Sequence, residues 1–261
     1  MIYVGTSGFK FDDWKGPFYP PGLPEREWLN FYARQFNCLE VNSSYYRLMP
    51  PTTFARMAEK TPPGFQFTVK AYKGMTHEFS EETEDAFRTF RESLEPLSQT
   101  DRLACVLAQF PNKFRNVSAN RQYLVEFQER LGDIRLVYEF RSRDWVRDET
   151  FAFLREKGIG YCAVDEPQFK SLVPPVAEAT SDIGYVRFHG RNYQNWWSGD
   201  AKKRYDYLYS LDELNEWVPR IAALDDVARK VFVFMNNCFG AQAAKNAAQM
   251  KDLLRPRLVE I

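Results

Sequence analysis

The chain has 261 residues, of which 16% are aromatic, and it carries 35 acidic and 35 basic side chains, so its formal net charge is zero. This length and composition are typical of a packed globular protein with a sizeable core, and they exclude a disordered chain. The neutral balance also excludes nucleic-acid binding through overall charge, although Arg141 with Arg143, or Lys202 with Lys203 and Arg204, can form a local basic patch.

The spacing of the cysteines and the lengths of the apolar runs indicate where in the cell the protein is expected. Four widely separated cysteines without a Cys-x-x-Cys pair predict buried free thiols in a reducing cytosol, not a disulfide framework or a zinc site. The first five residues enter a strand pattern directly, unlike a signal peptide, and no apolar run approaches the roughly 20 residues that span a bilayer. We therefore expect a cytoplasmic protein with no membrane partner, and the sequence leaves its oligomeric state open.

Eight short apolar runs recur along the chain, and we interpret each as a strand. They cover residues 2–5, 38–41, 65–69, 103–110, 134–140, 160–164, 184–188 and 230–235. Several are almost continuously apolar, as strands covered on both faces are.

Most intervals between these runs have the apolar spacing of a helix. The predicted helices cover residues 28–36, 54–58, 86–97, 117–131, 151–157, 210–224 and 240–254. Ser210 and Glu213 have the spacing of a capping box, which places a helix start there. The interval 167–182 is interrupted by Pro174 and Pro175, so we expect an irregular element in it.

This alternation predicts an α/β protein with a single (β/α)8 TIM-barrel domain over residues 1–261. A doubly wound open sheet has the same alternation and is the alternative. No Gly-x-Gly-x-x-Gly or Walker sequence favours a nucleotide-binding open sheet, and no Pro/Gly/Ser-rich linker divides the chain.

Polar residues follow the C-terminal end of every predicted strand, whereas the N-terminal ends show no such pattern. In chain order they are Thr6 and Ser7, Glu40 and Asn42, Lys70, Gln109, Glu139 and Arg141, Asp165 and Glu166, His189, and Asn236 and Asn237. The C-terminal ends of barrel strands converge on the face where active sites are built, so we predict a site there. The alternative is that these residues only mark where strands meet water. It explains Asp165 and Gln109 better than the four ionisable groups Glu40, Lys70, Glu139 and His189, which follow apolar runs.

Four of these groups are candidate catalytic residues. Glu40 and Glu139 can form an acid/base pair, or a glycosidase pair if their carboxyl groups lie about 5–9 Å apart. Alternatively, Glu139 forms a structural ion pair with Arg141 or Lys70. Lys70, if desolvated, can act as a Schiff-base nucleophile, although such a lysine more often neutralises a carboxylate or binds an anion. His189 can exchange a proton or contact an anion, and the alternative is a structural histidine.

No cofactor is predicted. Only two histidines are present, which argues against a histidine-rich zinc cluster. A single Mg or Mn ion held by Glu40, Glu139 and Asp165 is the one metal site that the inventory still allows.

The strand at 184–188 leads into a loop rich in arginine and aromatic residues, typical of surfaces that hold bases, phosphates or sugars. The alternative is that these rings pack onto the barrel as a lid. Together with the strand ends, this loop supplies the candidate substrate-binding residues. They are Ser7, Asn42, Gln109, Arg141, Arg187, Arg191, Trp196, Asn236 and Asn237.

Several motifs along almost the whole chain resemble the DUF72 (YecE-like) family. They are residues 4–9 (VGTSGF), 14–20 (WKGPFYP), 40–46 (EVNSSYY), 65–70 (FQFTVK), 109–111 (QFP), 139–141 (EFR), 186–190 (VRFHG) and 234–237 (FMNN). The sequence departs from the family at Met235, where an aromatic residue is more usual. The resemblance implies a TIM barrel without established biochemistry.

From the strand-end residues we predict an enzyme of hydrolase or isomerase type. It would act on a small anionic substrate, phosphorylated or derived from nucleic acid, by acid/base chemistry. The alternatives are a glycoside-active enzyme and a non-catalytic protein that binds single-stranded nucleic acid.

Overall fold

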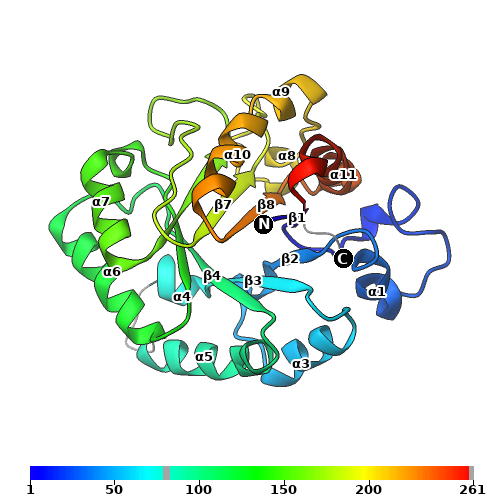
Figure 1. Cartoon of the computed structure of the whole chain (residues 1–261), viewed down its shortest axis with the longest axis horizontal. Coiled ribbons are helices and arrows are strands. Elements are labelled where there is room, and N and C mark those ends of the chain that lie inside the picture. Colours follow the sequence, from blue (N-terminus) through cyan, green and yellow to red (C-terminus); the bar gives the residue numbers. More distant parts are fainter. Residues whose placement is uncertain (79–82, 259–261) are drawn as a thin grey trace.

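Eight strands, each paired in parallel with its neighbours, form the centre of the computed structural model, which describes residues 1–78 and 83–258. They are β1 (Ile2–Thr6), β2 (Cys38–Val41), β3 (Gln66–Lys70), β4 (Leu103–Gln109), β5 (Leu136–Glu139), β6 (Gly160–Asp165), β7 (Ile183–Phe188) and β8 (Lys230–Met235). They follow one another in chain order around the sheet, and β1 pairs with β8. The amide of Gly8 donates to the carbonyl oxygen of Glu40 at 2.8 Å and brings the ends of β1 and β2 together (Figure 1).

The predicted (β/α)8 barrel is therefore confirmed, and each predicted apolar run overlaps one strand, with ends that differ by at most two residues. The open doubly wound sheet is wrong, because the strand order is sequential and β1 joins β8. The strands read as apolar runs because helices cover the outside of the barrel while side chains fill its inside.

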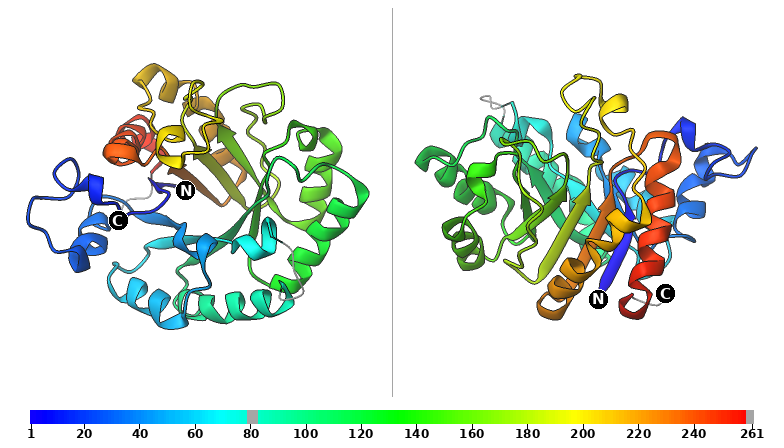
Figure 2. Two further views of the ribbon diagram at one scale, coloured as in Figure 1. Left: turned by 180° about the vertical axis from the view of Figure 1, so that it is seen from behind. Right: turned by 90° about the horizontal axis from the view of Figure 1, so that it is seen from above.

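Helices surround most of the barrel, and the segment between β6 and β7, residues 166–182, is irregular as predicted (Figures 1 and 2). The longer ones are α3 (Pro51–Glu59), α5 (Thr83–Gln99), α6 (Ser118–Leu131), α7 (Asp148–Lys157), α10 (Val218–Val227) and α11 (Gln242–Leu254). The shorter ones are α1 (Trp28–Tyr32), α2 (Ser43–Tyr46), α4 (Lys73–Thr76), α8 (Ala201–Arg204) and α9 (Leu211–Asn215). Short 3-10 turns are η1 (Asp12–Trp14), η2 (Glu25–Glu27), η3 (Arg143–Trp145), η4 (Phe239–Ala241) and η5 (Arg255–Arg257).

The predicted helix at residues 210–224 and its capping box differ in outcome. The capping box is present, because Ser210 Oγ accepts from the Glu213 amide at 3.2 Å and Glu213 Oε2 accepts from the Ser210 amide at 2.9 Å. The single helix predicted at 210–224 is wrong, since it divides into α9 and α10. Pro219 lies in the first turn of α10, where its missing N–H needs no partner, and there it starts a new helix instead of continuing α9.

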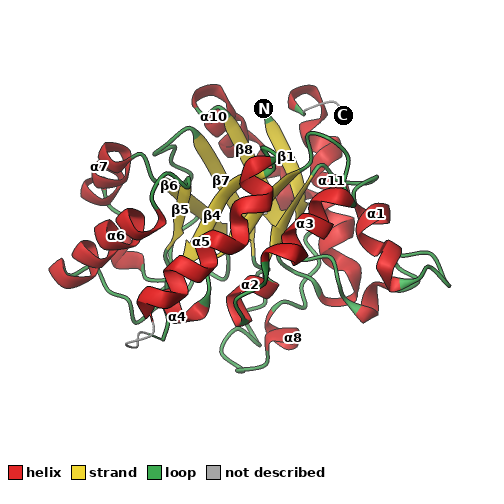
Figure 3. Ribbon diagram, turned by 90° about the horizontal axis from the view of Figure 1, so that it is seen from below, coloured by secondary structure: helices red, strands yellow, loops and turns green. Residues whose placement is uncertain are grey.

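The short helices α2 and α8 lie on the face opposite the two chain ends (Figure 3). They follow β2 and β7, so this face carries the C-terminal ends of the strands. We call it the mouth of the barrel. None of the helices in the described part of the chain is long and apolar enough to cross a membrane.

Candidate functional site

Alternate residues of β7 point into the barrel, because successive side chains of a strand face opposite ways. Tyr185 forms the deepest polar contact: its hydroxyl donates to Glu40 Oε2 at 2.6 Å and lies 2.9 Å from Thr68 Oγ1. All three side chains are fully buried. β7 is thereby linked across the interior to β2 and β3.

The substitution Tyr185→Phe tests the contacts of the Tyr185 hydroxyl with Glu40 and Thr68. Removing the hydroxyl leaves a buried carboxylate oxygen and the Thr68 hydroxyl without this partner, so we expect a loss of about 1–3 kcal/mol in the free energy of unfolding. Urea denaturation measures it, with Tyr46→Phe as the control because Tyr46 is 70% exposed. Equal stability of the two variants would show that the contact contributes nothing.

Arg187, one step further up β7, bridges two carboxylates. Its Nη1 donates to Glu139 Oε2 at 2.6 Å and its Nη2 donates to Glu40 Oε1 at 2.7 Å. Nη2 also lies 3.5 Å from the hydroxyl of Ser7. Burial disfavours the ionised form of Glu139, but the charges of Arg187 and Arg141 outweigh burial and hold the pKa of Glu139 well below its usual range. Glu139 is therefore a permanent anion.

His189 lies above Arg187 and is held from both sides. Its Nε2 lies 3.1 Å from Glu139 Oε1, and its Nδ1 lies 2.9 Å from the side-chain amide of Asn236. Because an ionised carboxylate only accepts hydrogen bonds, Nε2 carries the ring proton and Nδ1 accepts from Asn236. Burial, and then the charge of Arg141, lower the pKa of His189 well below its usual range. The imidazole is neutral and both of its nitrogens are engaged.

Arg141 follows β5 and lies nearer the mouth. Its Nε lies 2.7 Å from Glu139 Oε1 and its Nη1 lies 2.8 Å from Glu166 Oε2. Its second terminal nitrogen, Nη2, donates none of the hydrogen bonds of residues 1–78 and 83–258, and the side chain is 12% exposed. Burial raises the pKa of Glu166 to about 7 although Arg141 opposes this shift. Arg141 therefore contacts two carboxylates, and its Nη2 donates no hydrogen bond to the described residues.

Lys70 ends β3 and differs from the other ionisable groups of the interior. Its amine donates to Gln109 Oε1 at 3.0 Å and lies 4.4 Å from the centre of the Tyr45 ring. Among the described residues no carboxylate lies within ion-pair distance of it. Burial, and then the positive charges of Arg187 and Arg141, lower the pKa of Lys70 to about 7.

Two further groups border Lys70. His77 Nε2 lies 3.5 Å from the amide nitrogen of Gln109, and its ring meets Tyr45 edge-on at 5.2 Å between centres. Burial and the charge of Lys70 lower the pKa of His77 to about 4. Across the mouth, the ring of Tyr205 lies 6.2 Å from the ring of His189.

The loop after β7 is anchored by Arg191. Its guanidinium donates to both oxygens of Asp165, the closest contact being 2.7 Å, and to Glu216 Oε2 at 2.7 Å. Asp165 also accepts from the hydroxyl of Tyr209 at 2.6 Å and the indole of Trp217 at 2.7 Å. These contacts give Arg191 and Asp165 a structural role beside the site.

The structure brings most of the predicted site residues together. Contacts above link seven of them into one network: Glu40, Glu139, His189, Ser7, Arg141, Arg187 and Asn236. Lys70 and Gln109 form a separate pair beside it, and Gln109 pairs in strand register with Glu139. Asn237 instead donates to Tyr207 O and Asn246 Oδ1, and Trp196 is buried beneath Arg204, 5.7 Å from its guanidinium. Asn42 lies between β2 and α2, outside the linked set.

Sequence reasoning missed four residues of this region: Tyr45, His77, Tyr185 and Tyr205. Glu166 was among the polar strand-end residues but was not selected as a site residue. Tyr185 precedes Arg187 by two positions, so the two-residue period of a strand was a usable signal for it. Tyr45 lies in the four-residue helix α2, and His77 and Tyr205 lie in turns, so no periodicity indicates the direction of these side chains.

The described residues contain no group of three or more histidine, cysteine or acidic side chains that is placed to hold a metal ion. Glu40 and Glu139 face Arg187, while Asp165 faces Arg191. The three oxygen ligands named for a Mg or Mn ion are therefore not assembled around one point.

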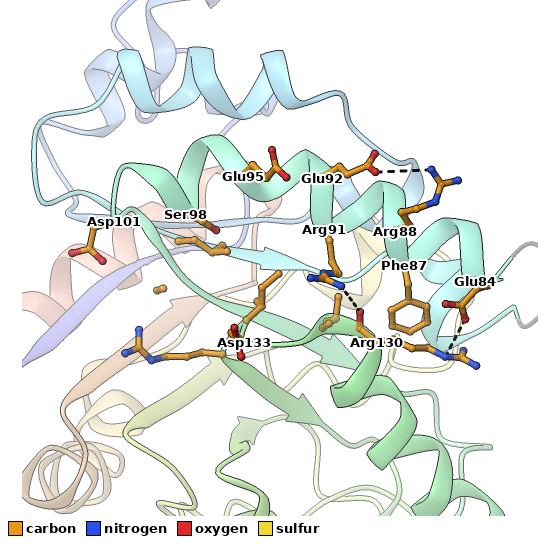
Figure 4. A pocket seen from close by; sticks show the side chains of 15 residues that line it. Glu84, Phe87, Arg88, Arg91, Glu92, Glu95, Ser98, Asp101, Arg130 and Asp133 are labelled. Carbon is orange, nitrogen blue, oxygen red and sulfur yellow. Dashed lines mark hydrogen bonds and ion pairs between the residues drawn. The ribbon is translucent and has the colours of Figure 1, made fainter.

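A groove of about 910 Å³ lies outside the barrel, between α5 and α6 (Figure 4). Its walls carry charges that pair with one another, such as Arg130 with Glu84 at 3.2 Å and Arg88 with Glu92 at 3.9 Å. The groove runs along the outer helices and is separate from the residues at the mouth.

The sequential parallel strands and the polar cluster at their C-terminal ends define a (β/α)8-barrel protein with an ionic network inside the barrel. The family model described as "Protein of unknown function DUF72" matches residues 3–260, so the chain belongs to the DUF72 family, as its motifs indicated. The chain is 37% identical to the UPF0759 protein YunF of Bacillus subtilis (strain 168), over 97% of this chain and 95% of that protein.

Two solved DUF72 structures have the same fold. One, from Thermotoga maritima MSB8, is 40% identical with a TM-score of 0.91, covering 98% of this chain and 99% of that one. The other, from Enterococcus faecalis V583, is 29% identical with a TM-score of 0.87, covering 100% and 97%.

Proposed function

We propose that this protein is an enzyme that binds a small anionic substrate at the mouth of the barrel and exchanges protons with it through Lys70. The observation that carries this proposal is the Lys70 amine, which is half-buried beside Tyr45 and Gln109 and makes no ion pair within the described chain. An amine with a pKa of about 7 is suited to acid/base work, because it both takes up and releases a proton near neutral pH.

The other three candidate catalytic residues support Lys70 better than they replace it. Glu139 is a permanent anion that accepts from Arg187 and lies against Arg141, so it has no proton to donate. Glu40 gives one oxygen to Arg187 and the other to Tyr185, and both nitrogens of His189 are engaged. We assign these three groups to positioning the two arginines.

The substrate class follows from the unsatisfied charges at the mouth. Arg187 and Arg141 each face two carboxylates, whereas Lys70 makes no ion pair in the described part of the chain. Nη2 of Arg141 donates no hydrogen bond to the described residues. A phosphate or carboxylate is the natural partner for a fixed guanidinium edge beside an amine. Phosphorylated compounds and nucleotide fragments both meet this requirement.

The glycoside alternative has less support, because a glycosidase needs one carboxylic acid that holds its proton near neutral pH. Glu139 is held ionised, and Arg187 lies between it and Glu40.

Binding of single-stranded nucleic acid is favoured by one observation. Trp197 and Tyr193 are 60% and 51% exposed around Phe169, and helix α8 beside them carries Lys202, Lys203 and Arg204. Exposed rings next to cations are typical of surfaces on which bases stack.

A binding experiment tests the proposed function. Titration calorimetry with a panel of sugar phosphates and nucleoside monophosphates should show binding to the native protein, and at least about tenfold weaker binding to Lys70→Met. Lys73→Met is the matched control, because Lys73 lies on the next segment and is ion-paired with Glu78 at 2.9 Å. Unchanged affinity in Lys70→Met would refute the role of Lys70.

A further inference from the structure

We infer that Lys70 forms an imine with an anionic aldehyde or ketone held at the mouth of the barrel. This inference rests on the function proposed above, since it uses the same amine and the same anion contact. It adds the class of compound and a covalent step.

The surroundings of the amine leave it free to react. Lys70 donates one hydrogen to Gln109 Oε1 at 3.0 Å, and the Tyr45 ring covers one side of the amine at 4.4 Å. Tyr45 is itself fixed against His77. Since no carboxylate in the described chain lies within ion-pair distance, no structural partner must be displaced before a carbonyl carbon approaches.

Neutrality of the amine is the second requirement, because only the free lone pair attacks a carbonyl carbon. Burial and the nearby arginines lower the pKa of Lys70 to about 7, so roughly half of the molecules carry a neutral amine at neutral pH. An exposed lysine with a pKa of about 10.4 is neutral in only about one molecule in 10³ under these conditions.

Arg141 supplies the contact for the anionic part of the compound. Its Nη1 donates to Glu166 Oε2 at 2.8 Å and its Nε lies at ion-pair distance, 2.7 Å, from Glu139 Oε1, while Nη2 donates no hydrogen bond to the described residues. Lys70 contacts Gln109 at 3.0 Å, and Gln109 pairs in strand register with Glu139, two residues before Arg141. A carboxylate or phosphate bound at Nη2 would therefore hold an attached carbonyl group on the side of the mouth where Lys70 lies. 2-Oxo acids and phosphorylated aldehydes have this arrangement.

The covalent step balances without an oxidant or reductant. The nitrogen lone pair attacks the carbonyl carbon, a C–N bond forms, and the carbonyl oxygen becomes a hydroxyl by taking up a proton. The C–O bond then breaks, the oxygen leaves as water with a second proton, and the nitrogen forms the C=N bond as it loses its hydrogens. The net change is amine plus carbonyl compound giving imine plus water.

Reductive trapping tests the inference on the whole protein. The protein is incubated at about pH 7 with glyoxylate and sodium cyanoborohydride, and the carboxymethylated lysines are located by peptide mass mapping. We expect Lys70 to be labelled at least about tenfold faster than Lys73. With uncharged acetaldehyde the ratio of Lys70 to Lys73 should fall several-fold, because Arg141 then has nothing to hold.

Two variants and one competitor complete the experiment. Lys70→Arg keeps a charge but forms no imine and should abolish the fast label, while Lys73→Arg should leave it unchanged. Inorganic phosphate should slow labelling of Lys70 and not of surface lysines.

Equal labelling of Lys70 and Lys73 overturns the imine. If phosphate compounds still bind the native protein and this binding is lost in Lys70→Met, the proposed function stands without imine formation. If that binding is absent as well, both fall.

Discussion

Arg187→Met should lower the free energy of unfolding by about 3–5 kcal/mol, because it leaves Glu40 and Glu139 buried without their shared cation. Both carboxylates are fully buried. The pKa of Glu139 should then rise, since burial is no longer offset by Arg187. A carboxyl group whose folded pKa exceeds its unfolded pKa contributes stability below the unfolded value and loses it as pH rises. The variant should therefore be less impaired in mild acid than at neutral pH.

Urea denaturation at about pH 5 and about pH 7 measures both effects. Arg135→Met is the matched control, because Arg135 is 49% exposed in its ion pair with Asp182 at 3.4 Å, and its loss should cost under about 1 kcal/mol. Arg187→Lys should be intermediate, since an ammonium is a point charge and cannot span both carboxylates with two nitrogens. A loss no larger than that of Arg135→Met would show that Arg187 does not hold the network.

Lys70→Met should change the pH dependence of stability. The pKa of Lys70 is about 7 in the folded chain and about 10.4 when unfolded, so the unfolded state binds more protons between these values. Stability therefore rises with pH across this window, with a slope of at most about 1.4 kcal/mol per pH unit. Below pH 7 the folded amine is charged and the full cost of burying it applies. Replacing it with an apolar side chain removes that cost, so the variant should be more stable than the native protein near neutral pH.

The measurement is the difference in unfolding free energy between Lys70→Met and the native chain, at about pH 7 and about pH 9. This difference should shrink as pH rises, because the native protein gains stability and the variant does not. Lys73→Met should show no such trend, since the pKa of Lys73 is raised by its hydrogen bond and ion pair with Glu78. A constant difference for Lys70→Met would mean that Lys70 titrates like an exposed lysine.

The ionic network explains how reactive groups are placed in an otherwise apolar barrel. Burying charges is costly unless each has partners, and here Arg187 and Arg141 share Glu139 between them. These carboxylates hold both guanidinium groups, and Nη2 of Arg141 donates no hydrogen bond to the described residues. The uncompensated amine of Lys70 is the exception in this arrangement, which is why we place the chemistry there.

The sequence alone determined the barrel and the location of its polar groups. The alternation of strands and helices is visible in the sequence as eight apolar runs separated by intervals with helical spacing. The runs are apolar because each barrel strand is covered on both faces. The sequence also indicated which residues meet, since the C-terminal ends of parallel strands converge in any such barrel. Glu40, Lys70, Glu139 and His189 were selected on that ground. Glu40, Glu139 and His189 share one network, and Lys70 contacts Gln109, which pairs in strand register with Glu139. The division of residues 210–224 at Pro219 was missed, although proline in the sequence was a usable signal.

Only the tertiary structure decided which charges pair. Arg187 and Arg191 are both arginines near the end of β7, yet one bridges Glu40 and Glu139 inside the barrel and the other anchors a loop on Asp165. Likewise, Glu139 and Glu166 are both buried acids, but the pKa of one is lowered and that of the other raised. These differences depend on distances of a few ångströms between residues remote in the chain, because burial and Coulomb interactions act through space. Sequence spacing sets the strand end on which a side chain lies, and the packed barrel sets its partner and therefore its charge.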